Sequence, residues 1–225
     1  MKKIAIIVAG GSGQRMGVKT PKQFLLLQGS PLLWYSVNAF LSAYDDLQII
    51  LVLPEAHLET GLAIKRLFKE SDRIQIISGG DTRFHSVQNG LNRIKENSVV
   101  FVHDGVRCLV TKELIQRCYE QAIIKGSAIP AVAATDSIRI AEGEKSFVTD
   151  RNHVRIIQTP QTFKSEILLP AFQQSYDASF TDEATVVEAT GQQIFLIEGE
   201  YSNIKITRPI DLLIAEKILE ERSVL

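Results

Sequence analysis

The sequence predicts an α/β fold, a Rossmann-like doubly wound domain with a mainly parallel sheet and a protruding β-hairpin arm. Three observations support this prediction. Short apolar runs alternate with segments of helical spacing, which is the pattern of a parallel sheet covered on both faces. The length of 225 residues suits one domain, 1–225. Between about residues 135 and 158 the alternation gives way to a pattern typical of a hairpin.

The elements follow in order from the first apolar run. Ile4–Val8 predicts a buried strand, and Pro31 suits the first turn of a helix that reaches about Tyr44. The hairpin is expected to turn at Gly143. Further strands are expected at Gln48–Leu53, Arg73–Ile77, Val99–His103 and Ala128–Val132, with short ones at Ile194–Ile197 and Asn203–Ile206. Further helices are expected at about 55–69, 84–95, 112–125, 165–174, 182–189 and 209–221.

The composition excludes several classes of protein. A net charge of −1 gives no broad basic face for nucleic acid. The apolar runs are too short to span a bilayer, and Met1-Lys2-Lys3 leads directly into a strand, so no membrane or secretory segment is expected. Cys108 and Cys118 lack metal-ligand spacing and are expected to be free, reduced thiols in the cytoplasm. The scattered histidines predict no metal cluster.

A glycine-dense segment, residues 8–17, follows the first strand and is the most informative feature. Such a turn lets backbone N–H groups converge on an anion, and Arg15 and Lys22 add two cations beside it. The P-loop pattern fails here, and so does the dinucleotide fingerprint, because Met16 occupies its third glycine position. The segment therefore indicates a nucleoside triphosphate site. The alternative is a tight strand-to-helix turn with incidental surface charges.

Other polar groups are predicted at the same edge of the sheet. The segments Gly79–Ser86 and Asp104–Arg107 follow strands, and Lys205 lies in an alternating segment. Taken singly, Asp104 is explained as a helix cap or turn acid, Lys205 as a solvated lysine of an edge strand, and residues 79–81 as a loop. Because ligands bind beyond the carboxyl ends of parallel strands, their shared location favours one pocket.

These motifs together resemble a known family. The segments are Ala9–Gly17 with Pro21–Phe24, Gly79–Arg83, Val102–Arg107, Asp150–Asn152, Gln158–Gln161, Thr181–Ala184 and Asn203–Thr207. The first resembles the start of sugar-phosphate nucleotidyltransferases, and the whole set, in the family's order over most of the chain, resembles the 2-C-methyl-D-erythritol 4-phosphate cytidylyltransferases. One departure is Gly105-Val106-Arg107-Cys108, where the family commonly has alanine after the acid and proline after the arginine.

The resemblance implies transfer of CMP from CTP to 2-C-methyl-D-erythritol 4-phosphate, giving 4-diphosphocytidyl-2-C-methyl-D-erythritol and pyrophosphate. It implies Mg²⁺ bound mainly through the CTP phosphates, with few or no protein ligands, and a homodimer formed through the arm, with Arg151 reaching the partner's acceptor site. The implied catalytic residues are Arg15, Lys22, Arg151 and Lys205. The implied CTP contacts are Ala9, Gly10, Gly11, Gly13, Gly80, Asp81 and Ser86, and the implied acceptor contacts are Asp104, Arg107, Thr159 and Thr181.

Three other interpretations remain open from the sequence. Ribitol 5-phosphate cytidylyltransferase shares the glycine loop, the Asp-x-x-Arg segment and the hairpin, although Thr181–Ala184 and Ile206–Pro209 look more like the erythritol enzyme. A molybdopterin cytidylyl or guanylyl transferase would use another acceptor or base. A non-catalytic nucleotide-binding regulator would not need Arg15, Lys22, Asp104 and Lys205 together.

Overall fold

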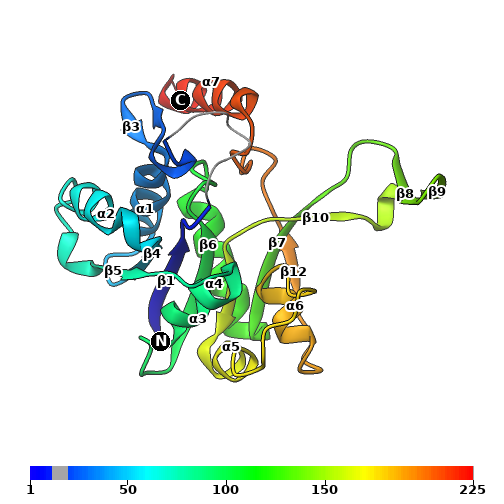
Figure 1. Ribbon diagram of the computed structural model, residues 1–225, viewed down its shortest axis with the longest axis horizontal. Helices are drawn as coiled ribbons and strands as arrows, with labels where there is room; N and C mark the ends of the chain where they lie inside the picture. Colours follow the sequence, from blue (N-terminus) through cyan, green and yellow to red (C-terminus); the bar gives the residue numbers. More distant parts are fainter. Residues whose placement is uncertain (12–19, 225) are drawn as a thin grey trace.

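A computed structural model describes residues 1–11 and 20–224 and contains a mainly parallel sheet (Figure 1). Within these residues the sheet has eight strands, in the order β10-β7-β11-β6-β1-β4-β5, with β12 also pairing with β7. The bounds are β1 Lys2–Val8, β4 Gln48–Leu53, β5 Ile74–Ser78, β6 Ser98–Asp104, β7 Ser127–Ala133, β10 Arg155–Ile157, β11 Gln161–Lys164 and β12 Leu196–Glu198. The ladders are parallel except those of β10 and β11. The predicted doubly wound α/β class is confirmed.

Helices cover both faces of the sheet, because alternate residues of each strand face opposite sides. In β1, Ala5 and Ile7 belong to one apolar cluster, while Ile4, Ile6 and Val8 belong to another. The first cluster lies under α1 (Leu32–Ala43), α2 (Leu58–Lys65) and α4 (Lys112–Lys125). The second lies under α3 (Arg83–Leu91), α5 (Ser165–Ala171) and α6 (Glu183–Glu188). The closing helix α7 (Pro209–Val224) packs on a third, smaller cluster that includes Leu27, Cys108 and Ile206.

Several predicted elements need correction. Residues Asn203–Ile206 do not form a strand. Their backbone makes isolated hydrogen bonds and not the repeated ladder of a sheet, for example from the Ile206 N–H to the Val106 carbonyl at 3.1 Å. The helices expected to reach residues 69, 95 and 174 end earlier, at Lys65, Leu91 and Ala171. Beyond these ends the backbone makes tighter i→i+3 hydrogen bonds, as from Ile94 N–H to the Leu91 carbonyl. The predicted 55–69 helix also begins with a separate 3₁₀ turn, Glu55–His57.

The predicted arm has a different C-terminal boundary. Its hairpin consists of β8 (Ile138–Glu142) and β9 (Lys145–Thr149), which turn at Gly143 with a φ of 59°. Figure 1 shows this hairpin extending away from the sheet. A 3₁₀ turn, Arg151–His153, follows. Residues 155–157, which were expected in the arm, instead form β10 against β7 in the main sheet.

Smaller features complete the fold. A short hairpin joins β2 (Leu26–Leu27) to β3 (Ser30–Pro31), and 3₁₀ turns occur at Lys22–Phe24 and Ser71–Arg73. Cys108 and Cys118 are free thiols, as predicted. Both are buried, and burial raises the pKa of each to about 12. Across the described part of the chain, no helix combines the length and apolar character needed for a membrane crossing.

Candidate active site

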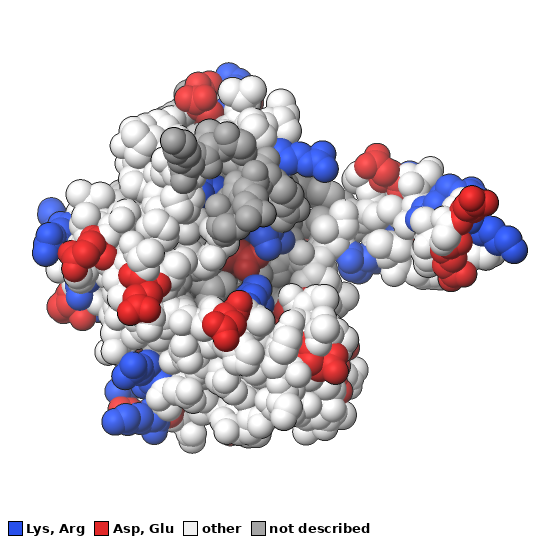
Figure 2. Space-filling view, viewed as in Figure 1, with Lys and Arg blue, Asp and Glu red and all other residues white. Residues whose placement is uncertain are grey.

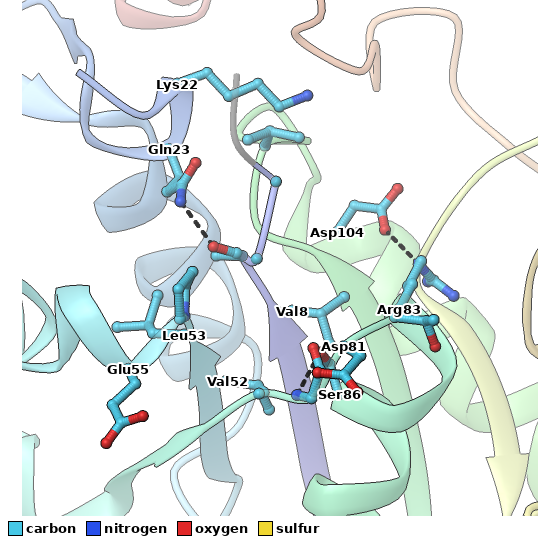
Figure 3. Close-up of a pocket in the computed structure, with 18 of the residues that line it drawn as sticks. Val8, Lys22, Gln23, Val52, Leu53, Glu55, Asp81, Arg83, Ser86 and Asp104 are labelled. Atoms are coloured by element: carbon cyan, nitrogen blue, oxygen red, sulfur yellow. Dashed lines mark hydrogen bonds and ion pairs between the residues drawn. The ribbon is translucent and has the colours of Figure 1, made fainter. Parts of the chain in front are cut away.

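A cavity of about 490 Å³ lies at the carboxyl edge of β1, β4, β5 and β6 (Figure 3). Figure 2 shows acidic and basic side chains next to one another at the centre of one face of the molecule. The cavity is lined by Val8, Ala9, Gly10, Gly11, Lys22, Gln23, Val52, Leu53, Pro54, Glu55, Gly79, Gly80, Asp81, Thr82, Arg83, Ser86, Asp104, Val106 and Lys205. The cavity therefore lies at the edge of the sheet that the sequence predicts for a ligand site.

One wall of the cavity comes from the segment after β1. The Ala9 N–H bonds to the Val52 carbonyl, and the Ala9 carbonyl accepts a 2.8 Å hydrogen bond from the buried amide of Gln23. Both backbone polar groups of Ala9 therefore already have a partner within the protein. Lys22 enters from the 3₁₀ turn Lys22–Phe24, and its Nζ lies 3.2 Å from the Ile206 carbonyl. The predicted residues Gly13 and Arg15 lie outside the described residues.

The facing wall comes from the turn between β5 and α3. The Gly80 N–H donates to Ser86 Oγ at 3.1 Å, which ties this turn to the first turn of the helix. A Cβ added at Gly80 would lie 2.5 Å from His85 Cβ, so the turn can approach α3 this closely only with glycine there. Thr82 caps α3 by accepting the His85 N–H. Asp81 is exposed and lines the cavity (Figure 3).

An ionic cluster forms the far side of the cavity, where β6 ends at Asp104. Asp104 Oδ1 accepts from Arg83 Nε at 3.2 Å, and Asp104 Oδ2 lies 2.8 Å from Lys205 Nζ and 3.8 Å from Arg107 Nε. Burial alone would raise the pKa of Asp104, but the charges of Arg83, Lys205 and Arg107 outweigh it and hold that pKa well below its usual range. Asp104 is therefore an anion at neutral pH and is shared by three cations.

Sequence reasoning missed two members of this cluster, Arg83 and Glu183. The Arg83 guanidinium bonds both oxygens of Glu183, with Nη1–Oε1 at 2.5 Å and Nη2–Oε2 at 3.0 Å. Burial alone would lower the pKa of Arg83, but Glu183 and Asp104 raise it above its ordinary value. Arg83 and Glu183 both lie within sequence segments that carry the family resemblance, Gly79–Arg83 and Thr181–Ala184. Their place in these segments was the signal that could have identified them as site residues. Glu183 follows the helix cap Asp182 and is explained from sequence alone as a first-turn acid.

Four predicted residues are not among those that line the cavity. Arg107 donates to the carbonyls of Asn203 and Ile157. The Thr159 hydroxyl is buried and accepts the Asp104 N–H at 3.1 Å. Thr181 is exposed ahead of α6, and Arg151 is exposed in the arm, where it donates to the Thr135 carbonyl at 2.7 Å. The substrate contacts proposed for these four residues remain predictions.

A buried histidine supports the loop that carries Asp104. His103 lies within hydrogen-bond distance of the Thr159 hydroxyl and the Arg107 carbonyl, at 3.0 and 3.2 Å. Burial lowers the pKa of His103 to about 3, so the ring is neutral at pH 7. With one nitrogen protonated, Nε2–H donates to the Arg107 carbonyl while Nδ1 accepts from Thr159. Thr159 and Arg107 therefore hold the backbone around Asp104 in place.

The departure at Gly105 also has a structural explanation. A Cβ there would lie 2.9 Å from Leu33 Cδ1 and 3.1 Å from Ala9 Cβ. Glycine at 105 therefore lets the end of β6 pack closely on α1 and on the segment after β1. Cys108, at the position where the family commonly has proline, is buried in the cluster under α7.

Together these walls suit a polyphosphate ligand. Lys22, Lys205 and Arg83 bring cations to a cavity bounded by a glycine segment at the end of a parallel strand. Fixed cations and a glycine-containing segment at this edge of an α/β sheet are features that a nucleotidyltransferase requires, because the chemistry of that class depends on charge neutralisation.

Comparison with known proteins identifies the family. The model of the IspD family, 2-C-methyl-D-erythritol 4-phosphate cytidylyltransferase, matches residues 3–221. The Phocaeicola vulgatus enzyme of that name is 42% identical over 219 residues, covering 97% of this chain and 100% of the relative. The Bacteroides thetaiotaomicron enzyme is 43% identical, with the same coverage. The structure of 4-diphosphocytidyl-2C-methyl-D-erythritol synthase from Anaerococcus prevotii superposes with a TM-score of 0.83 at 26% identity, over 97% of this chain and 99% of that one. The chain belongs to the IspD family.

Proposed function

We propose that this chain transfers the cytidylyl group of CTP to 2-C-methyl-D-erythritol 4-phosphate. An oxygen of the acceptor's phosphate attacks the α-phosphorus of CTP, the bond from that phosphorus to the bridging oxygen breaks, and pyrophosphate leaves. The products are 4-diphosphocytidyl-2-C-methyl-D-erythritol and pyrophosphate. The observation that carries the proposal is the cavity at the end of β1, which Lys22, Arg83 and Lys205 line beside a glycine segment, in a chain that belongs to the IspD family.

Catalysis by this cavity would come from positioning and charge neutralisation. The attacking oxygen already carries negative charge, so no general base is needed, and the obstacle is repulsion between two anionic substrates. Lys22, with Arg15, is proposed to bind the triphosphate and to stabilise charge on the leaving pyrophosphate. Lys205, which also lines the cavity and whose Nζ lies 2.8 Å from Asp104 Oδ2, is proposed to bind the α-phosphate and the acceptor phosphate.

The base and ribose are proposed to lie between the two walls. Gly80, Asp81 and Ser86 would contact cytosine, since all three line the cavity and present short polar groups. Gly10 and Gly11, with Gly13, would supply backbone N–H groups to the phosphates. Ala9 would contribute an apolar contact, because its N–H and carbonyl are already hydrogen-bonded.

The acceptor is proposed to bind near Asp104. Asp104 faces the cavity, whereas Arg107 and Thr159 support it through the contacts described above. We expect Arg107 and Thr159 to affect acceptor binding chiefly through the placement of Asp104. Thr181, exposed just before α6, is proposed as a direct acceptor contact.

Magnesium is proposed to bind through the phosphate oxygens of CTP. The described residues contain no group of three His, Cys, Asp or Glu side chains placed to hold a metal. Asp104, the carboxylate at the cationic side of the cavity, is already shared by three cations. This donor set suits an ion held mainly by substrate oxygens and water, which would reduce the negative charge of the triphosphate.

We further propose a homodimer formed through the arm, in which Arg151 reaches the acceptor site of the partner subunit. The β8–β9 hairpin supports this because Ile140 and Phe147, which pair across its two strands and share a face, are both 52% exposed. Val148, on the other face, is 76% exposed. Exposed apolar side chains on a projecting hairpin suit a protein contact. The free, buried thiols of Cys108 and Cys118 support a reducing, cytoplasmic location.

The test of the activity is incubation with CTP, Mg²⁺ and 2-C-methyl-D-erythritol 4-phosphate, followed by mass analysis of the product. The expected result is the diphosphocytidyl product with one pyrophosphate released per turnover. Parallel reactions with ribitol 5-phosphate, and with ATP, GTP and UTP, test the specificity. Faster pyrophosphate release with ribitol 5-phosphate or with another nucleotide would overturn the proposed substrates.

A further inference from the structure

Arg83 connects two acidic residues that come from different parts of the chain. It is the first residue of α3 and lies between Asp104 at the end of β6 and Glu183 at the start of α6. Its Nε donates to Asp104 Oδ1 at 3.2 Å, and its two terminal nitrogens donate to the two oxygens of Glu183. The guanidinium plane is therefore fixed from two sides, as a forked donor allows and a lysine would not.

Glu183 is held on a rigid frame. Its side chain is 1% exposed. The neighbouring backbone is fixed by Gln161, whose Oε1 accepts the Ala184 N–H at 2.8 Å and whose Nε2 donates to Asp182 Oδ2 at 2.8 Å. Gln161 belongs to β11 and pairs with Val102 of β6, two residues before Asp104. The strand that carries Asp104 therefore also sets the position of Glu183.

The two oxygens of Asp104 have different partners. Oδ1 bonds Arg83, whereas Oδ2 faces Lys205 at 2.8 Å and Arg107 at 3.8 Å. A carboxylate bonded at Oδ1 cannot turn freely, so the place of Oδ2, and with it the place of the Lys205 ammonium, depends on Arg83. Lys205 is 40% exposed and has a long, flexible side chain, so the bond to Asp104 is what restricts it.

We propose that Glu183 is a positioning residue for the transfer reaction: it fixes Arg83, which fixes Asp104, which places Lys205 at the cavity. This inference rests on the proposed function, in which Lys205 and Asp104 act on the α-phosphate and the acceptor. Glu183 is also the counter-charge of Arg83. Without it, the guanidinium would be free to turn toward Asp104 Oδ2 and compete with Lys205 for that oxygen.

The test compares Glu183→Gln with wild-type enzyme in steady-state kinetics and in equilibrium binding of CTP. We expect kcat/KM for the acceptor to fall about 10- to 100-fold, as a small misplacement of reacting groups typically causes. We expect the dissociation constant of CTP to change less than threefold. The matched control is Glu200→Gln, which removes a carboxylate paired with Arg117 at 3.3 Å outside the residues that line the cavity. Its kinetics are expected to match wild type.

A double-mutant cycle separates positioning from a general loss of stability. If Glu183 acts through Arg83, then adding Glu183→Gln to Arg83→Gln changes kcat/KM by less than twofold. Additive losses, wild-type kinetics of Glu183→Gln, or an equal loss in Glu200→Gln would each overturn the inference. If Glu183→Gln does not fold, Glu183→Asp, which keeps the charge but withdraws it by one methylene, carries the same expectations. Activity of the wild-type enzyme, measured alongside, shows separately whether the proposed function holds.

Discussion

Replacing Asp104 by asparagine is the most direct perturbation of the ionic cluster. The cluster contains three cations, Arg83, Arg107 and Lys205, and two anions, Asp104 and Glu183. The substitution raises its net charge from one to two positive charges. Asparagine can still accept a hydrogen bond from Arg83, but its NH₂ group would face the Lys205 ammonium in place of Oδ2. The variant therefore places two hydrogen-bond donors, the asparagine NH₂ and the Lys205 ammonium, against each other where the wild type has a 2.8 Å contact between Asp104 Oδ2 and Lys205 Nζ.

The expected loss of stability follows from this arrangement. Removing one partner of a buried ion pair typically costs about 3–5 kcal/mol. Here Arg83 keeps Glu183, and Lys205 is 40% exposed and can turn into water, so we expect the lower end, about 3 kcal/mol. For a chain of this length that corresponds to a decrease in Tm of about 6–12 °C.

Urea unfolding measures this loss through the single tryptophan, Trp34, which stacks on Phe68. The control is Asp46→Asn. This variant removes the same group from a pair with Lys3 in which the carboxylate is 65% exposed, and it should change the free energy of unfolding by less than about 1 kcal/mol. If Asp104→Asn costs no more than Asp46→Asn, the account of the cluster is wrong.

The pH dependence gives a second measurement on the same variant. The neighbouring cations hold the folded-state pKa of Asp104 below its unfolded value of about 3.9. Its contribution is therefore fully present above that unfolded value and is lost as the pH falls toward the lower folded-state pKa. The stability difference between wild type and Asp104→Asn should stay constant from pH 8 to about 5 and narrow below about pH 4. If the stability difference between the two proteins changed between pH 6 and 8, the pH dependence would have to come from a group other than Asp104.

Three further predictions concern other parts of the site. Lys22→Ala should lower kcat by on the order of 10²-fold, because it removes a cation that stabilises the transition state, and single-turnover kinetics near the wild-type rate would exclude that role. Arg151→Ala should raise the KM of the acceptor or lower kcat while CTP binding, measured by calorimetry, persists; unchanged steady-state kinetics would refute its proposed role in the partner's site. Gly105→Ala should lower the free energy of unfolding by about 1–3 kcal/mol, because its Cβ would lie 2.9 Å from Leu33 Cδ1. An unchanged urea midpoint would show that Leu33 moves aside at no cost.

The sequence predicts the sheet well because its central strands have a strong local signal. The strand Gln48–Leu53 and the helix Lys112–Lys125 have the predicted bounds. The strand is a continuous apolar run and the helix is amphipathic with a capping residue, and each of these patterns can be recognised locally. The three- and four-residue strands β10 and β11 were missed because so few residues show no periodicity. The predicted strand Asn203–Ile206 was wrong for the opposite reason: its alternation suggested a strand, but none of the described strands pairs with it.

The sequence predicted where the site lies in the fold, but not the ion pairs and hydrogen bonds that connect its side chains. The motifs placed Lys22, Gly80 and Asp104 at one sheet edge, where the cavity lies. Arg83 and Glu183 are 100 residues apart, and no local pattern indicates that they form an ion pair. Arg107 and Thr159 lie beside Asp104 as expected, yet the direction of their side chains, toward backbone groups instead of the cavity, depends on packing that a sequence pattern does not encode.

A crystal structure of the protein with CTP and Mg²⁺ would show directly whether the cavity at the end of β1 binds the nucleotide. We expect cytosine against Gly80, Asp81 and Ser86, with the triphosphate beside Gly10, Gly11 and Lys22. Ordered CTP bound elsewhere, or with its phosphates directed away from Lys22 and Lys205, would contradict this expectation.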